Sequence, residues 1–145
     1  METLLRLSTL LIILFTVTAF GQERKITLND LPPAAKTFIS QNFPNQAPSY
    51  IIEDKDIRET EYEVVMTGGV EMEFDAKGNC KEIDGNGYAL PDTVLPKVIM
   101  EYIHKNYKGQ GVEKAEKKRW GYEVELLNDL ELEFDNSGKF LRLDD

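Results

Sequence analysis

The chain has 145 residues, of which 41% are hydrophobic and 30% are charged, so it is long enough for one ordinary domain and too polar for a multi-pass membrane protein. Its 26 acidic residues against 17 basic ones give a net charge of −9, which argues against nucleic acid or anionic lipid as the main partner. One Cys and one His leave little material for a zinc site, a Cys-His nucleophile pair or a Ser-His-Asp triad.

Residues 1–21 have the features of a secretory signal peptide. Arg6 precedes the apolar run 7–20, and the small residues Ala19 and Gly21 favour a cut between Gly21 and Gln22. The apolar run is shorter than the roughly 20 residues that span a bilayer, which argues against a membrane anchor. We therefore expect a periplasmic or secreted mature chain, residues 22–145, that is not inserted in a membrane.

Cys80 is the only cysteine, so the chain cannot form an internal disulfide in an oxidising compartment. The sequence favours a small buried hydrophobic residue at this position over a reactive thiol.

The mature chain contains the same pattern twice. A Leu-Pro segment with an apolar helical stripe begins at Leu31 and recurs 64 residues later at Leu95. The strand-like segments 62–64 and 70–78 recur 60 residues later as 122–124 and 130–138. The change in offset predicts a four-residue deletion in the connection after the second helix, and the repetition indicates a tandem duplication.

Each repeat is predicted to begin with a helix. Apolar residues recur at helical spacing from Leu31 to Phe43 and from Leu95 to Tyr107. The candidate N-caps are Asn29 or Asp30 for the first helix and Asp92 or Thr93 for the second.

The remainder of each repeat alternates with period two, which is typical of strands. The expected strands are 49–53, 61–66, 70–75 and 80–84 in the first repeat, and 112–116, 122–126, 130–135 and 140–143 in the second. Gly68-Gly69 and Asn128-Asp129 predict tight turns, and Gly78 and Gly138 predict left-handed turn positions.

The predicted fold class is α+β. Two tandem α-β-β-β-β units share one antiparallel sheet of about eight strands, with both helices packed on one face and an acidic opposite face. The units are residues 22–87 and 88–145, and they form one continuous domain, because a unit of about 60 residues is marginal alone.

The paired Leu-Pro helices, the segments 62–64 and 122–124 and the segments 71–78 and 131–138 resemble the PepSY-like family of exported Bacteroidetes proteins. That family is described as similar in fold to the beta-lactamase inhibitor protein. The resemblance covers residues 26–145 and implies tandem α+β units in a continuous sheet, with no assigned biochemical function. The inhibitor's disulfides and contact loops have no counterparts in this chain, so no inhibitory site is carried over.

Acidic side chains alternate along the strands of both repeats. In the structural interpretation, these side chains form the solvated face of a half-buried sheet. The functional alternative is a calcium site or a surface for a basic partner. The candidate metal ligands in that alternative are Glu71, Glu73, Asp75, Glu131, Glu133 and Asp135.

A basic cluster leads into the only tryptophan of the chain. The candidate protein-binding residues here are Lys114, Lys117, Lys118, Arg119, Trp120 and Tyr122, since Trp and Arg are enriched at interface hot spots. The alternative is an exposed hairpin in which Trp120 covers the sheet edge.

The sequence therefore predicts an exported, non-catalytic module without a cofactor that binds a protein of the envelope or a secreted protein, as an inhibitor or modulator. The alternative function is a calcium-responsive module that uses the acidic sheet face. An enzyme ranks third, because the sequence offers no nucleophile-base pair and no phosphate-binding loop.

Overall fold

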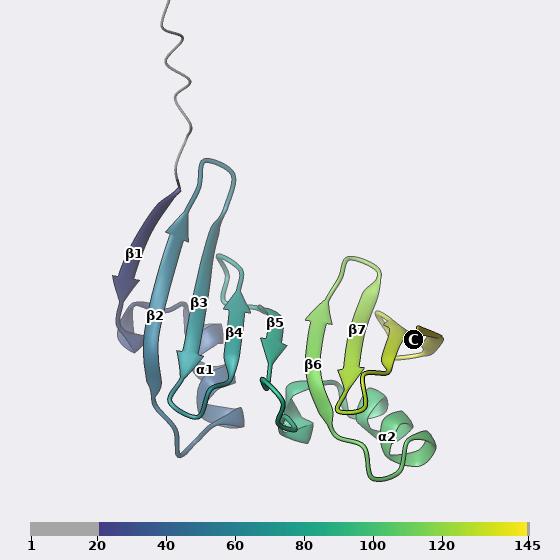
Figure 1. Ribbon diagram of the computed structural model, residues 1–145. Helices are drawn as coiled ribbons and strands as arrows, with labels where there is room; N and C mark the ends of the chain where they lie inside the picture. Colours follow the sequence, from purple (N-terminus) through teal and green to yellow (C-terminus); the bar gives the residue numbers. More distant parts are fainter. Residues whose placement is uncertain (1–20, 145) are drawn as a thin grey trace, which may run out of the picture.

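The computed structural model describes residues 21–144, which form one antiparallel sheet of nine strands in sequential order (Figure 1). The strands are β1 (Gln22–Ile26), β2 (Pro48–Lys55), β3 (Thr60–Met66), β4 (Glu71–Phe74), β5 (Cys80–Asp84), β6 (Val112–Lys117), β7 (Gly121–Leu126), β8 (Glu131–Asp135) and β9 (Phe140–Asp144). Two helices, α1 (Pro33–Asn42) and α2 (Lys97–Asn106), follow the 3-10 turns η1 (Leu28–Asp30) and η2 (Asp92–Val94).

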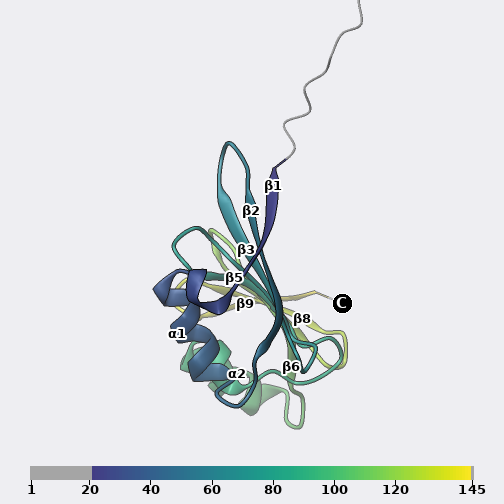
Figure 2. The same ribbon diagram turned by 90° about the vertical axis from the view of Figure 1, so that its left-hand side faces the viewer.

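Both helices cover the same face of the sheet (Figure 2). The core lies between these two layers, where Ala35 and Ile39 of α1 and Ile99 and Ile103 of α2 are buried together with the apolar residues of the strands. Neither helix in residues 21–144 combines the length and apolar character needed to cross a membrane. The opposite face, which no helix covers, is called the open face below.

The structure confirms two repeated units in one sheet. Helix α2 and strands β6–β9 repeat α1 and strands β2–β5, and the two units join where β5 pairs with β6. In that junction Ile83 lies opposite Ala115, so the core continues from one unit into the next.

The prediction of about eight strands misses β1. This strand pairs with β2 along its whole length, and Arg24 donates two hydrogen bonds to the buried carboxylate of Glu53, at 2.6 and 3.0 Å. Residues 22–26 show no apolar alternation, because β1 is an edge strand held mainly by its backbone and this ion pair. It has no counterpart in the second repeat.

The predicted helix caps are also wrong. Helix α1 begins after Pro32 and α2 after Pro96, and no side chain caps either helix. Asp30 instead accepts hydrogen bonds from the N–H and hydroxyl of Thr27, in a capping box of η1. The fixed φ of proline prepares the first helical turn without a polar cap.

The four-residue deletion lies later than the sequence suggests. Tyr50 pairs with Val65 in the first unit and Lys114 pairs with Glu125 in the second, so the offset of 64 persists through β6. The chain is shortened in the β6–β7 hairpin rather than in the connection that follows α2.

The predicted strand turns are confirmed. Gly78 and Gly138 have φ values of 84° and 83°, and each donates its N–H to the carbonyl of the aspartate three residues earlier. Asp129 has φ of 66° in the β7–β8 turn. A left-handed residue in these positions lets each strand reverse within a few residues.

Candidate functional site: the acidic open face

A row of six glutamates crosses the open face from β3 to β8. The strand register places them directly opposite one another in the order Glu63, Glu73, Glu82, Glu116, Glu123 and Glu133. We call these six residues the glutamate row. Ile52 of β2 and Arg142 of β9 lie at its two ends.

Like charges directly opposite each other destabilise a sheet, and four cations reduce this cost. Lys81 forms an ion pair with Glu73 (3.1 Å) and also contacts Glu61. The other pairs are Lys114–Glu82 at 2.7 Å, Arg142–Glu133 at 2.7 Å, and Lys118 with Glu116 at 2.6 Å and with Glu123 at 3.8 Å. Glu63 forms no ion pair among residues 21–144 and only approaches the Tyr50 hydroxyl at 3.5 Å.

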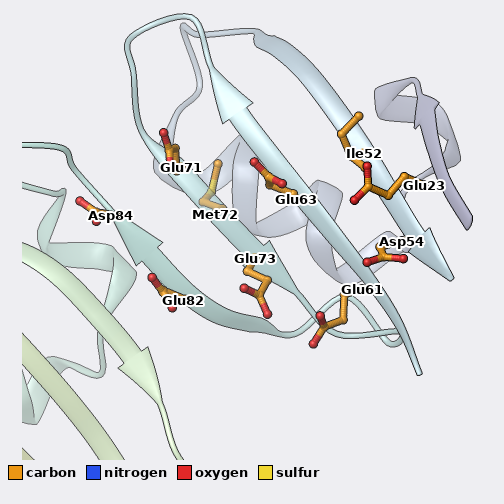
Figure 3. A pocket seen from close by; sticks show the side chains of 10 residues that line it. All are labelled: Glu23, Ile52, Asp54, Glu61, Glu63, Glu71, Met72, Glu73, Glu82 and Asp84. Carbon is orange, nitrogen blue, oxygen red and sulfur yellow. The ribbon is translucent and has the colours of Figure 1, made fainter. Parts of the chain in front are cut away.

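The first unit forms an acidic depression on this face. Its cavity of about 220 Å³ has eight carboxylates in its lining, from Glu23, Asp54, Glu61, Glu63, Glu71, Glu73, Glu82 and Asp84. Figure 3 shows these side chains gathered on one face of β1–β5. Asp54 Oδ1 is buried there without a hydrogen-bond partner in the described part of the chain. We call this region the acidic depression.

On the open face of the second unit, more of the negative charge is balanced by lysine side chains. Lys114 and Lys118 of the β6 segment occupy the positions that Tyr50 and Asp54 occupy in β2. Both lysines extend over the open face and pair with glutamates of the row. The same face is therefore strongly acidic over the first unit and partly neutralised over the second.

Three carboxylates of the second unit do approach one another closely. Oxygen atoms of Glu123, Glu131 and Glu133 all lie within 4.8 Å of each other. Burial and the nearby charge of Glu131 raise the pKa of Glu123 above its ordinary value. Both oxygens of Glu133 already accept hydrogen bonds from Arg142, at 2.7 and 2.8 Å.

Two of the six predicted metal ligands are engaged elsewhere. Asp75 accepts hydrogen bonds from the N–H groups of Lys77 and Asn79, and Asp135 accepts them from Ser137 and Lys139. In Asp75 these bonds outweigh the effect of burial, and the pKa falls below its ordinary value. Both aspartates therefore stabilise turns, while Glu71, Glu73, Glu131 and Glu133 lie on the open face.

The predicted basic cluster is divided between the two faces of the sheet. Lys114 and Lys118 lie on the open face, in ion pairs with glutamates. On the helix-covered face, the Lys117 ammonium lies 4.7 Å from the centre of the half-buried Tyr122 ring. Arg119 and Trp120 occupy the β6–β7 turn, where Trp120 is 41% exposed.

Cys80, which the sequence predicts to be buried, is half-buried and packs against the core. Burial raises the pKa of its thiol to about 12, so the reactive thiolate is scarce at neutral pH.

Sequence reasoning found part of the acidic face and missed the rest. It identified the alternating glutamates of β3, β4, β7 and β8, but not Glu23, Asp54, Glu82, Asp84 and Glu116 as members of the same surface. For Glu82, Asp84 and Glu116, the signal in the sequence is a charge at alternate positions of β5 and β6, and only the strand register connects these residues to the other strands.

Two repeated helix-and-sheet units, joined edge to edge and bearing a polar open face, define the class of protein. The chain belongs to the family described as "Putative beta-lactamase-inhibitor-like, PepSY-like", whose model matches residues 18–64 and 60–142. The first matched segment ends at Val64 within β3, and the second runs from Thr60 through the rest of the first repeat and nearly all of the second. No curated protein matches the chain.

Solved structures of Bacteroides proteins share the fold. A "putative periplasmic protein of unknown function" from Bacteroides vulgatus is 38% identical, with a TM-score of 0.78 over 86% of this chain and 100% of the other. A second "putative periplasmic protein" from Bacteroides vulgatus is 32% identical, with a TM-score of 0.78 over 86% of this chain and 98% of the other. A "putative calcium-regulated periplasmic protein" from Bacteroides thetaiotaomicron is 32% identical, with a TM-score of 0.79 over 85% and 97%.

Proposed function

We propose that this chain is a non-enzymatic periplasmic protein whose acidic depression binds a basic segment of another exported protein. Export rests on the signal peptide predicted for residues 1–21, of which residues 1–20 lie outside the described part of the chain, and on the periplasmic proteins that share the fold. The beta-lactamase-inhibitor-like description of the family supports a binding role over a catalytic one.

The observation that carries the proposal is the concentration of carboxylates in the acidic depression. Eight carboxylates line it, while Lys81 is the cation that forms ion pairs among them, and Lys114 reaches Glu82 from the second unit. Sheets ordinarily avoid opposed like charges, and departures from such local rules concentrate at functional sites. A basic segment that docks here would relieve this repulsion.

Electrostatics would also define how the partner binds. A surface of one sign raises the rate of encounter with an oppositely charged partner and suppresses contact with acidic ones. Ile52, half-buried between the carboxylates of the depression, offers an apolar contact beside the charges. The partner we expect is therefore a protein segment rich in Lys or Arg with an apolar residue among them.

Affinity capture tests this proposal. The full chain, purified after export and immobilised, is exposed to a periplasmic and secreted extract at physiological salt. In parallel we use the double variant Glu63→Gln, Glu71→Gln in the first unit and the matched variant Glu123→Gln, Glu131→Gln in the second. We expect one set of basic proteins on the wild-type column, retained by the second-unit variant and lost from the first-unit variant. Equal capture by all three columns would exclude the acidic depression as the contact.

Calcium binding is the second candidate function, favoured by the proximity of Glu123, Glu131 and Glu133. Calcium takes about six to eight oxygen ligands, and carboxylates with water can supply them. The Bacteroides thetaiotaomicron protein that shares the fold is named as calcium-regulated, which supports the same candidate here. Burial and repulsion from Glu131 together raise the pKa of Glu123, and an ion at this place would also offset the repulsion.

Thermal unfolding with calcium or magnesium distinguishes this candidate. If the three glutamates hold calcium, the melting temperature rises with calcium and not with equal magnesium. Glu131→Gln then abolishes the rise, while Glu71→Gln, the same change in the first unit, preserves it. An unchanged melting temperature in millimolar calcium would remove this candidate and leave the binding of a basic segment untouched.

A further inference from the structure

The two edges of the sheet differ in how well they resist pairing with another strand. Four of the five residues of β1 are polar or charged, which discourages edge-to-edge association. Strand β9, at the opposite end of the sheet (Figure 1), instead exposes Leu141 and Leu143, at 49% and 44%. No strand within residues 21–144 pairs with its outer edge.

The first repeat contains an equivalent strand edge that is already paired with another strand. Strand β5 is the counterpart of β9, and its outer edge is filled by β6 in an antiparallel pair. Ile83 lies opposite Ala115 on the helix-covered side, and Asp84 lies opposite Lys114 on the open face. Leu143 and Asp144 of β9 are the counterparts of Ile83 and Asp84 of β5. The outer edge of β9 therefore resembles the outer edge of β5, which binds a strand in this chain.

The backbone of β9 also has the correct hydrogen-bond phase. Leu126 donates its N–H to the carbonyl of Leu130 at 2.9 Å, which fixes Glu131 and Glu133 as the residues of β8 that bond to β9. Bonded and non-bonded pairs alternate in an antiparallel ladder. Arg142 and Asp144 therefore direct their N–H and carbonyl groups to β8, and Leu143 directs both groups outward.

A second β9 fits this edge without repulsion. When two copies pair antiparallel with Leu143 opposite Leu143, the two residues exchange both backbone hydrogen bonds. In the same register Arg142 of each copy lies opposite Asp144 of the other on the open face. The two leucines meet on the helix-covered side, so apolar and charged contacts fall on their proper faces.

We propose that this protein forms a symmetric dimer through β9, in an antiparallel register centred on Leu143. The two-fold axis runs perpendicular to the sheet, so both acidic open faces lie on one side of a continuous sheet and all the helices on the other. This interface goes beyond the proposed binding function and leaves the acidic depression, at the far end of each sheet, exposed.

Sedimentation of the purified full chain at physiological salt tests the dimer, under conditions where repulsion between two acidic copies is screened beyond about 8 Å. We expect a reversible monomer–dimer equilibrium with a dissociation constant in the micromolar range. Leu143→Pro removes an outward N–H that β8 does not use, and we expect it to raise the dissociation constant by about tenfold or more.

Lys25→Pro, on the opposite edge of the sheet, is the matched control. The hydrogen bond from the Asp56 N–H to the Glu59 carbonyl fixes the alternation of bonded pairs in β2 and β3. Carried on to β1, this alternation directs the Lys25 N–H outward as well. Lys25→Pro leaves the dimer unchanged if β9 is the interface. A chain that stays monomeric at every concentration, or a Leu143→Pro variant that dimerises as well as the wild type, overturns the proposal.

Cysteine cross-linking tests the register. In a Cys80→Ser background, Leu143→Cys faces its own copy across the two-fold axis and forms a disulfide-linked dimer under mild oxidation. Leu141→Cys lies about 13 Å from its own copy in this register, so it cross-links slowly. Equal cross-linking of the two variants would show that the strands do not pair in this register.

Discussion

The two repeats share a backbone but differ in how each treats its open face. In the first, Tyr50, Ile52 and Asp54 of β2 bring no cation to that face, and the acidic depression results. In the second, the equivalent strand supplies Lys114 and Lys118, which pair with the glutamate row. Duplication thus produced one half that keeps its negative charge and one that offsets much of it.

This difference separates stability from binding. Ion pairs between partly exposed groups contribute about 0–1 kcal/mol each, so the lysines of the second unit add little stability beyond relief of repulsion. Their absence from the first unit leaves carboxylates available to a ligand. Under the proposed function, binding therefore belongs to the first half, and the open face of the second half has a more structural role.

The cores of the two halves also differ, in the number of their aromatic contacts. In the second unit, Phe134 makes edge contacts with Tyr102 and Phe140, at 5.5 and 5.8 Å between ring centres, and Tyr102 stacks on Phe140. In the first unit, Phe74 contacts Phe38 at 5.7 Å, and Cys80 occupies the position that corresponds to Phe140.

The largest effect we expect comes from these two rings. Phe74 and Phe134 are fully buried, so replacing either with Ala costs about 3–5 kcal/mol in the free energy of unfolding. The milder change Phe134→Leu should cost about 1 kcal/mol more than Phe74→Leu, because it loses one more aromatic contact. Urea unfolding measures both, and equal costs would show that the cores do not differ.

The second largest effect we expect is a change in binding affinity when charges are exchanged between the repeats. Asp54→Lys gives the first unit the residue that the second carries as Lys118, and we expect it to weaken binding of a lysine-rich peptide by about tenfold. Lys118→Asp, the reciprocal change, should strengthen binding by a smaller factor. Titration calorimetry measures both affinities, and an unchanged affinity for Asp54→Lys contradicts the asymmetry.

A smaller effect is expected at Glu123. Its raised pKa, which burial and Glu131 cause, means that the folded state disfavours the ionised carboxylate. The associated stability is present below the ordinary carboxylate pKa and is lost as pH rises through the folded-state pKa. Glu123→Gln should therefore raise the melting temperature at pH 7 and leave it nearly unchanged near pH 4. Glu63→Gln, the exposed counterpart, should change less, and a loss of stability in Glu123→Gln at pH 7 would contradict this account.

The smallest effect is expected at Trp120, in the shortened hairpin that distinguishes the second repeat. The ring is 41% exposed, so Trp120→Ala should change the free energy of unfolding by about 1 kcal/mol or less. The prediction from sequence that Trp120 contacts a partner does not depend on its contribution to stability. Capture from periplasmic extract tests this prediction. Loss of the captured protein in this variant would extend the contact to the second half.

The sequence was sufficient to predict the repeat, the helix-covered and open faces and most strands, because each depends on local periodicity. Val64 and Met66 alternate with charged or half-buried neighbours, and that alternation alone assigns their face. The glutamate row could not be predicted, since bulges near Phe74, Tyr50 and Lys114 decide which glutamates stand opposite one another. β1 was missed for a related reason, because its partner in β2 lies about 30 residues away and its own sequence has no period.

The most direct test of the central claim is an NMR titration of the full chain, isotope-labelled and purified after export, with a lysine-rich peptide. We expect the largest amide shifts on β2–β5 around the acidic depression, and small shifts on the open face of β6–β9. Shifts that are equal in the two repeats, or concentrated around the β6–β7 turn, would contradict the assignment of binding to the first half.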